Sequence, residues 1–98
     1  MARYLLLWEV DPAKIPIDRK ERGAGWGALM KMVRQDHEKG LISSWGNFVG
    51  ETNGYMVIEG SEVEVMNAIQ QYVPFVIFDV KPVASEEQVN EMIKALTG

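Results

Sequence analysis

The chain has 98 residues, which is enough for one domain and too few for two, so residues 1–98 are expected to form a single domain. An apolar fraction of 47% and a charged fraction of 24% are typical of a globular protein and argue against a disordered one. The net charge of −4 and the scattered basic residues argue against nucleic acid binding, and the absence of cysteine excludes disulfides, thiolate metal sites and cysteine nucleophiles.

The first predicted element is a buried strand at the N-terminus. The segment Arg3–Val10 is short and apolar, and the dipeptide Asp11-Pro12 follows it directly. This apolar run is too short to span a membrane and lacks the cleavage pattern of a signal peptide. We therefore expect no membrane partner, and the missing disulfide framework fits a cytoplasmic protein.

A long helix is predicted next. Asp18 followed three residues later by Glu21 resembles an N-terminal capping box, and Gly40 is a typical residue just beyond a helix end. One face of this helix would carry residues that recur at helical spacing: Trp26, Met30, Val33 and His37.

The start of this helix is ambiguous because it contains glycines at positions 23, 25 and 27. Each glycine inside a helix costs roughly 1 kcal/mol relative to alanine. Either the helix begins near Gly25 after a flexible loop, or it begins at the Asp18 cap and the glycines allow close approach of another group. The glycine cost favours the later start.

A β-hairpin is predicted after the helix. Residues 41–51 and 55–59 read as two strands, and Asn53-Gly54 between them is the strongest hairpin signal in the chain. Ser61 and Glu64 then form a second capping box, and the helix that they start should end before Pro74.

The last part of the chain predicts one more strand and one more helix. Residues 75–80 read as a fourth strand that Pro82 ends, and Ser85 caps a final helix. The apolar stripe of that helix consists of Val89, Met92, Ile93 and Leu96.

The order β-α-β-β-α-β-α places the chain in the α+β class. Its first six elements are those of the ferredoxin-like βαββαβ arrangement, with an antiparallel sheet in the order 4-1-3-2 and helices on one face. The C-terminal helix is an addition to that arrangement.

Both faces of this sheet are predicted to be apolar at their centres. In the first strand, Leu6 and Trp8 share one face with the even-numbered residues, while Leu5 and Leu7 share the other. Four strands about 4.8 Å apart make a sheet wider than one helix of ~10 Å diameter can cover. We therefore expect a homodimer that buries the second face. The alternative is a monomer whose last helix folds under the sheet.

The layout resembles that of the dimeric α/β-barrel superfamily. The residues that carry this resemblance are residues 72–83 (YVPFVIFDVKPV), followed by the acidic helix start Ser85-Glu86-Glu87, and they look most like small uncharacterised bacterial members. More distantly the chain resembles muconolactone isomerases. The resemblance implies two ferredoxin-like subunits paired sheet to sheet, and it carries no catalytic motif.

A small-molecule pocket is predicted between the sheet and the helices. If Asn53-Gly54 forms a two-residue turn, Trp45 and Asn47 share a face with Met56 and Ile58, as do Val49 and Glu51. The candidate lining then consists of Tyr4, Trp8, Trp26, Trp45, Asn47 and Phe78. A three-residue loop would remove the argument for Trp45 and Asn47, and plain core packing of the aromatic residues is the alternative interpretation.

His37, the only histidine, is the candidate catalytic residue. On the inner face of its helix it could act as a general base or hydrogen-bond to a ligand, whereas at the helix end it could simply interact with the negative pole. No nucleophile or orienting partner accompanies it. One histidine with dispersed carboxylates lacks metal-ligand spacing, and no motif predicts a cofactor.

Three functions fit these observations. The first is a homodimer that binds a small apolar or aromatic molecule. The second is a cofactor-independent isomerase or monooxygenase in which His37 or Asn47 handles protons. The third is a structural subunit that only assembles. The fold cannot decide among them, because one fold supports many functions.

Overall fold

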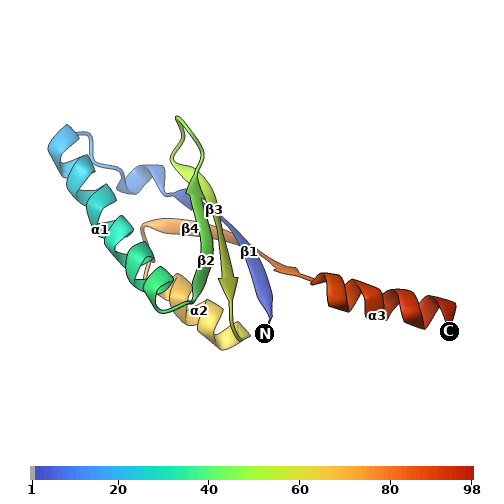
Figure 1. The fold of residues 1–98 in the computed structure, drawn as a ribbon. Helices are drawn as coiled ribbons and strands as arrows, with labels where there is room; N and C mark the ends of the chain where they lie inside the picture. Colours follow the sequence, from blue (N-terminus) through green and yellow to red (C-terminus); the bar gives the residue numbers. More distant parts are fainter. Residues whose placement is uncertain (1) are drawn as a thin grey trace.

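The computed structural model describes residues 2–98 and has a ferredoxin-like α+β fold with an added C-terminal helix (Figure 1). Its elements are β1 (Arg3–Val10), the short 3-10 helix η1 (Pro12–Lys14), α1 (Arg19–Glu38), β2 (Ile42–Asn47), β3 (Asn53–Glu59), α2 (Glu62–Gln70), β4 (Val76–Val83) and α3 (Glu86–Thr97). The antiparallel sheet has the order β2-β3-β1-β4. This is the predicted order 4-1-3-2 read from the opposite edge, so the predicted fold class is confirmed.

The core lies between the sheet and the two helices α1 and α2. In β1 the even-numbered residues Leu6, Trp8 and Val10 are buried, as predicted for the face under the helices. The other buried core residues come from the remaining strands, from both helices and from the turn after α2: Ile42, Met56, Ile58, Val76, Val33, Val65, Ala68 and Tyr72. We call this side of the sheet the covered face.

The hairpin between β2 and β3 differs from the prediction. Its turn is centred on Val49-Gly50, where the Glu51 N–H donates to the Phe48 carbonyl at 3.0 Å and Gly50 has a φ of +82°. A positive φ favours glycine at this position, and the Asn53-Gly54 dipeptide instead begins β3. Val49 is therefore fully exposed and outside the strand.

The faces of the hairpin residues nevertheless agree with the prediction for Trp45 and Asn47. Trp45 pairs with Met56 and Asn47 pairs with Gly54, so both lie on the covered face. The turn is displaced along the chain such that Trp45 and Asn47 each meet a partner an even number of positions away from the predicted one, whereas Ile42, before the register shift, does not. Because side chains alternate with a period of two, an even displacement preserves the face.

The late start predicted for α1 is wrong, because α1 begins at Arg19. The Asp18 carboxylate caps it by accepting a hydrogen bond from the Glu21 N–H at 3.1 Å, as the alternative prediction required. A Cβ added at any of the glycines 23, 25 and 27 would have no atom within 4 Å. Nothing within residues 2–98 therefore approaches these glycines closely, so the structure does not support close approach of another group as the reason for them. They lie inside α1, whose cap and inner-face packing outweigh their cost.

The remaining helix starts follow the sequence closely. Ser61 with Glu64 and Ser85 with Gln88 both form complete capping boxes, at the starts of α2 and α3. The fourth strand is longer than predicted, because Pro82 lies inside it, opposite Tyr4. β4 is an edge strand, where a residue without an N–H donor is tolerated.

The other side of the sheet, which we call the open face, has no helix over it. Figure 1 shows α3 extending away from the sheet as a continuation of β4, and every residue of α3 is exposed. The open face carries exposed apolar side chains of β1, β4 and the residue before β4: Leu7, Phe75 and Ile77. No helix within residues 2–98 has both the length and the apolar composition needed to cross a membrane.

Candidate functional site

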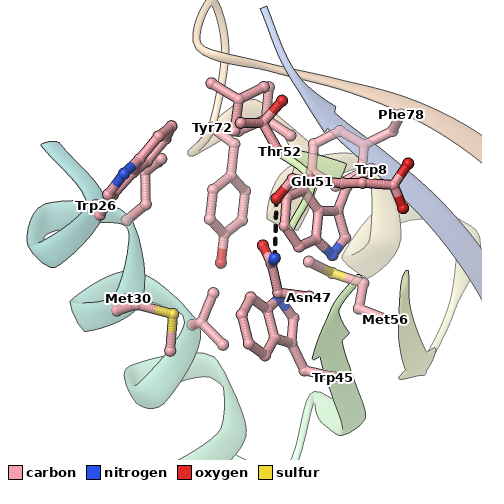
Figure 2. Close-up of a pocket in the computed structure, with 14 residues that line it drawn as sticks. Trp8, Trp26, Met30, Trp45, Asn47, Glu51, Thr52, Met56, Tyr72 and Phe78 are labelled. Atoms are coloured by element: carbon pink, nitrogen blue, oxygen red, sulfur yellow. Dashed lines mark hydrogen bonds between the residues drawn. The ribbon is translucent and has the colours of Figure 1, made fainter. Parts of the chain in front are cut away.

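A cavity of about 280 Å³ lies on the covered face, between the sheet and α1 (Figure 2). We call it the tryptophan cavity. It is lined by Trp8, Val10, Trp26, Leu29, Met30, Val33, Trp45, Asn47, Glu51, Thr52, Met56, Tyr72, Val76 and Phe78. Five of the six residues predicted to bind a ligand are therefore brought together around one space.

Two stacked indoles form the sheet side of the cavity. The rings of Trp8 and Trp45 lie 5.6 Å apart between centroids and are inclined by only 8°. The Trp8 indole N–H donates to the Tyr55 carbonyl at 3.0 Å, which fixes the ring over β3. Burying the polar atom in a hydrogen bond leaves an apolar, rigid surface for contact with a flat molecule.

Gly54 makes room for this pair. It is the residue opposite Trp8 in the β1–β3 ladder. A Cβ at this position would lie 2.6 Å from the Trp8 ring and would also collide with the Gly46 carbonyl oxygen. The glycine thus allows the indole to lie directly on the backbone of β3, a close approach that no other residue permits.

Tyr72 and Phe78 form a further wall. Their rings meet edge to face at 5.8 Å. Tyr72 is only 3% exposed, and its hydroxyl donates to the Asp36 carboxylate at 3.2 Å. Burial and the neighbouring Asp36 carboxylate raise the pKa of Tyr72 well above its usual value. Tyr72 therefore lines the cavity as a neutral ring whose hydroxyl is already engaged.

Asp36 itself is a buried carboxylate of α1 that sequence reasoning missed. It is 1% exposed and accepts from Tyr72 and from the Gln71 amide at 3.5 Å, so it ties α1 to the end of α2. A buried carboxylate is costly unless it is hydrogen-bonded, and these two donors supply the bonds. Asp36 thus fixes the position of the Tyr72 ring through this hydrogen bond.

The polar rim of the cavity comes from the hairpin loop. The Asn47 amide donates to the carbonyls of Phe48 and Glu51 at 2.8 and 3.0 Å, which closes the loop. The Thr52 carbonyl accepts a hydrogen bond from the Val10 N–H at 3.0 Å, which holds Thr52 beside β1. Glu51 brings the only carboxylate among the lining residues. Asn47 keeps its amide oxygen as an acceptor at this rim.

The helix side of the cavity is formed by α1. Figure 2 shows Trp26 and Met30 on this side, across from the sheet residues Trp8 and Trp45. Trp26 is half-buried and Met30 is exposed at the edge. Both side chains line the cavity.

Two predicted site residues lie outside this lining. Tyr4 packs against the core near the start of β1, opposite Ile58 and Pro82. His37 is exposed, so the expectation that it lies on the inner face of α1 is wrong. The buried face of α1 is rotated by somewhat less than one residue, 100° in a helix, and brings Asp36 inward instead.

The chemistry available at this site is recognition of an apolar surface. No group of three or more His, Asp or Glu side chains within residues 2–98 is arranged to hold a metal ion. Its walls are aromatic and aliphatic, the Tyr72 hydroxyl is engaged by Asp36, and the polar residues Asn47, Glu51 and Thr52 are exposed at the rim. No protein-family model matches the chain, and a search of curated proteins finds no relative.

Proposed function

We propose that the protein binds a small apolar or aromatic molecule in the tryptophan cavity. The observation that carries this proposal is the open space itself. A hollow of about 280 Å³, with exposed residues at its rim, stays unfilled among three tryptophans in a domain of only 98 residues. Apolar walls with a few polar groups at the rim are the usual composition of small-molecule sites.

The lining also limits the chemistry of the ligand. Glu51 is the only charged group among the lining residues, and none of them is Lys or Arg. A ligand with an acidic group would meet a like charge at the rim and no compensating cation. A flat molecule without an acidic group, stacked on the Trp8–Trp45 pair and hydrogen-bonded to the Asn47 amide oxygen, fits best.

Binding is favoured over acid–base catalysis by the same lining. A cofactor-independent isomerase or monooxygenase needs a group that gains or loses a proton within reach of the substrate. His37 is not among the lining residues, and the hydroxyl of Tyr72 is committed to Asp36. Only Glu51 remains, at the exposed rim.

We also propose that the protein is a homodimer that buries its open face. The support is the exposed apolar surface of Leu7, Phe75 and Ile77 on that face, which is unusual for a monomer. The resemblance to the dimeric α/β-barrel superfamily points the same way. In that arrangement each subunit keeps its own tryptophan cavity on the far side of its sheet.

The ligand proposal is tested with an uncharged aromatic fluorophore, N-phenyl-1-naphthylamine. We expect saturable quenching of tryptophan fluorescence with one molecule bound per chain, because all three tryptophans line the cavity. Quenching that rises linearly without saturation would mean collisional encounters, and the proposal would be wrong.

A matched pair of variants locates the binding. Met30→Lys places a charge at the cavity edge, whereas Met66→Lys places the same charge on an exposed methionine of α2 outside the lining. We expect Met30→Lys to weaken the affinity by roughly tenfold, equivalent to about 1.4 kcal/mol, and Met66→Lys to leave it unchanged. Equal effects of the two variants would place the fluorophore elsewhere.

A further inference from the structure

The C-terminal helix α3 has an apolar stripe and nothing covering it. Val89, Met92, Ile93 and Leu96 recur at helical spacing and are between 41% and 79% exposed. The opposite side is polar, with Glu87, Asn90, Glu91 and Lys94. A helix of 12 residues is marginally stable in water by itself, so its stripe requires a packing partner.

The dimensions of the chain show how much surface lacks a partner. The accessible surface is 7048 Å², whereas a compact monomer of 11.1 kDa has about 5,650 Å², so the excess is about 1,400 Å² per chain. The radius of gyration of 16.3 Å likewise exceeds the ~13 Å expected for a compact domain of this length. Two chains that buried this excess would bury about 2,800 Å², which is within the range of obligate homodimers.

We infer that α3 is an arm exchanged between two copies of this chain, and that its apolar stripe packs on the open face of the other copy's sheet. This inference rests on the proposed homodimer and specifies what covers its interface. In the structure α3 points away from its own sheet and leaves its own open face uncovered (Figure 1). The open face of a second copy can lie beside α3, where α3 extends away from the first chain.

A second copy fits better than an unrelated protein because one chain carries both complementary surfaces. Under two-fold symmetry each arm covers the partner's sheet while its own sheet is covered in return, which closes the assembly. One helix of ~10 Å diameter covers about half of a four-stranded sheet. The other half of each open face is then left for direct contact between the two sheets.

The first test compares two glutamate substitutions on α3 by sedimentation equilibrium of the full chain. Ile93→Glu places a charge within the stripe, and Asn90→Glu places the same charge on the polar side. We expect Ile93→Glu to raise the dimer dissociation constant by roughly a hundredfold or more, because it buries an unpaired charge in both arms, and Asn90→Glu to leave it unchanged.

A third variant separates failure of the arm from failure of the dimer. Leu7→Asp charges the open face directly and should dissociate the dimer whichever element covers that face. If Leu7→Asp dissociates the dimer and Ile93→Glu does not, the dimer stands and the exchanged arm is wrong. If the unmodified protein sediments only as an 11.1 kDa species, both are wrong.

Cross-linking shows which chain the arm covers. The protein lacks cysteine, so Ile77→Cys with Ile93→Cys gives a chain with two defined thiols for a flexible bis-maleimide. Unlabelled and ¹⁵N-labelled chains are unfolded together, refolded and cross-linked before mass spectrometry of the peptides. Links of mixed isotope between positions 77 and 93 are expected. Uniform isotope in every such link would mean that the helix folds back on its own sheet, which overturns the inference.

Discussion

The two faces of the sheet differ in what covers them, although both are apolar. Leu6 and Leu7 are neighbours of the same residue type on β1, yet Leu6 is 0% exposed beneath the helices and Leu7 is 38% exposed on the open face. Strand alternation explains why they point in opposite directions. Alternation does not determine which chain covers each face. The covered face lies under α1 and α2 and carries the tryptophan cavity, whereas the open face has no helix over it.

The largest expected effect tests this difference directly. Leu6→Ala should lower the free energy of unfolding by about 3 to 5 kcal/mol, because it leaves a void in a packed core. Leu7→Ala should cost about 1 kcal/mol in solutions dilute enough to separate the chains. At higher concentrations its cost should rise, since the dimer stabilises the unmodified protein more.

Urea denaturation at several protein concentrations provides the measurement. Met66→Ala on the exposed side of α2 serves as the control, with little change at any concentration. Equal costs for Leu6→Ala and Leu7→Ala at every concentration would erase the distinction between the two faces. That result would mean that the open face is covered within a single chain.

A smaller effect is expected from the hydrogen bond between Asp36 of α1 and Tyr72 in the turn after α2. Tyr72→Phe removes one of the two donors to buried Asp36 and should lower the free energy of unfolding by about 1 to 3 kcal/mol near neutral pH. Thermal or urea unfolding measures this loss. The variant should also loosen the wall that Tyr72 contributes to the tryptophan cavity.

The same variant has a predicted pH signature. The pKa of Tyr72 is raised in the folded state above the ordinary value of 10.0, so the folded protein holds this proton more tightly than the unfolded chain. The stability from this group is complete below pH 10 and falls as the pH rises toward the folded pKa. The unmodified protein should therefore lose stability more steeply than Tyr72→Phe as the pH rises above 10.0. Parallel curves would show that Tyr72 is not held neutral.

The smallest effect concerns the first turns of α1. Gly25→Ala and Gly27→Ala should each raise the free energy of unfolding by up to about 1 kcal/mol, because an added Cβ meets no atom within 4 Å. Amide exchange at residues 19–28 should slow, as should exchange of a bound fluorophore past Trp26. A loss of stability in either variant would show that this part of α1 is not helical.

Much of the fold was predictable because its signals are local or periodic. The serine capping boxes, the glycine after α1 and the alternation in β1 each depend on a few neighbouring residues, and the structure has all of them. The antiparallel sheet order followed from the order of these elements. Of the five predicted residues around the cavity, Trp8, Trp45, Asn47 and Phe78 were found from strand alternation and Trp26 from helical spacing.

The errors arose where tertiary packing decides between local alternatives. Asn53-Gly54 is a strong turn signal, but Gly54 is needed beneath the Trp8 ring, so the turn forms at Gly50. The inner stripe of α1 was assigned to Trp26, Met30, Val33 and His37, whereas His37 is exposed and its neighbour Asp36 is buried. A buried aspartate is recognised only when its donor, Tyr72, is known to be adjacent.

The register shift in β2 between Ile42 and Ser44 determines where the hairpin can change length. Ile42 and Trp45 are an odd number of residues apart, yet both face the helices, because one extra residue is accommodated between them. A deletion of Ser43 would give a regular ladder and leave Trp45 in place. A deletion of Gly46 would turn the residues on one side of it to the other face. When homologous sequences are aligned, single-residue deletions in β2 should therefore fall at Ser43 or Ser44. Insertions or deletions elsewhere in this strand should be rare.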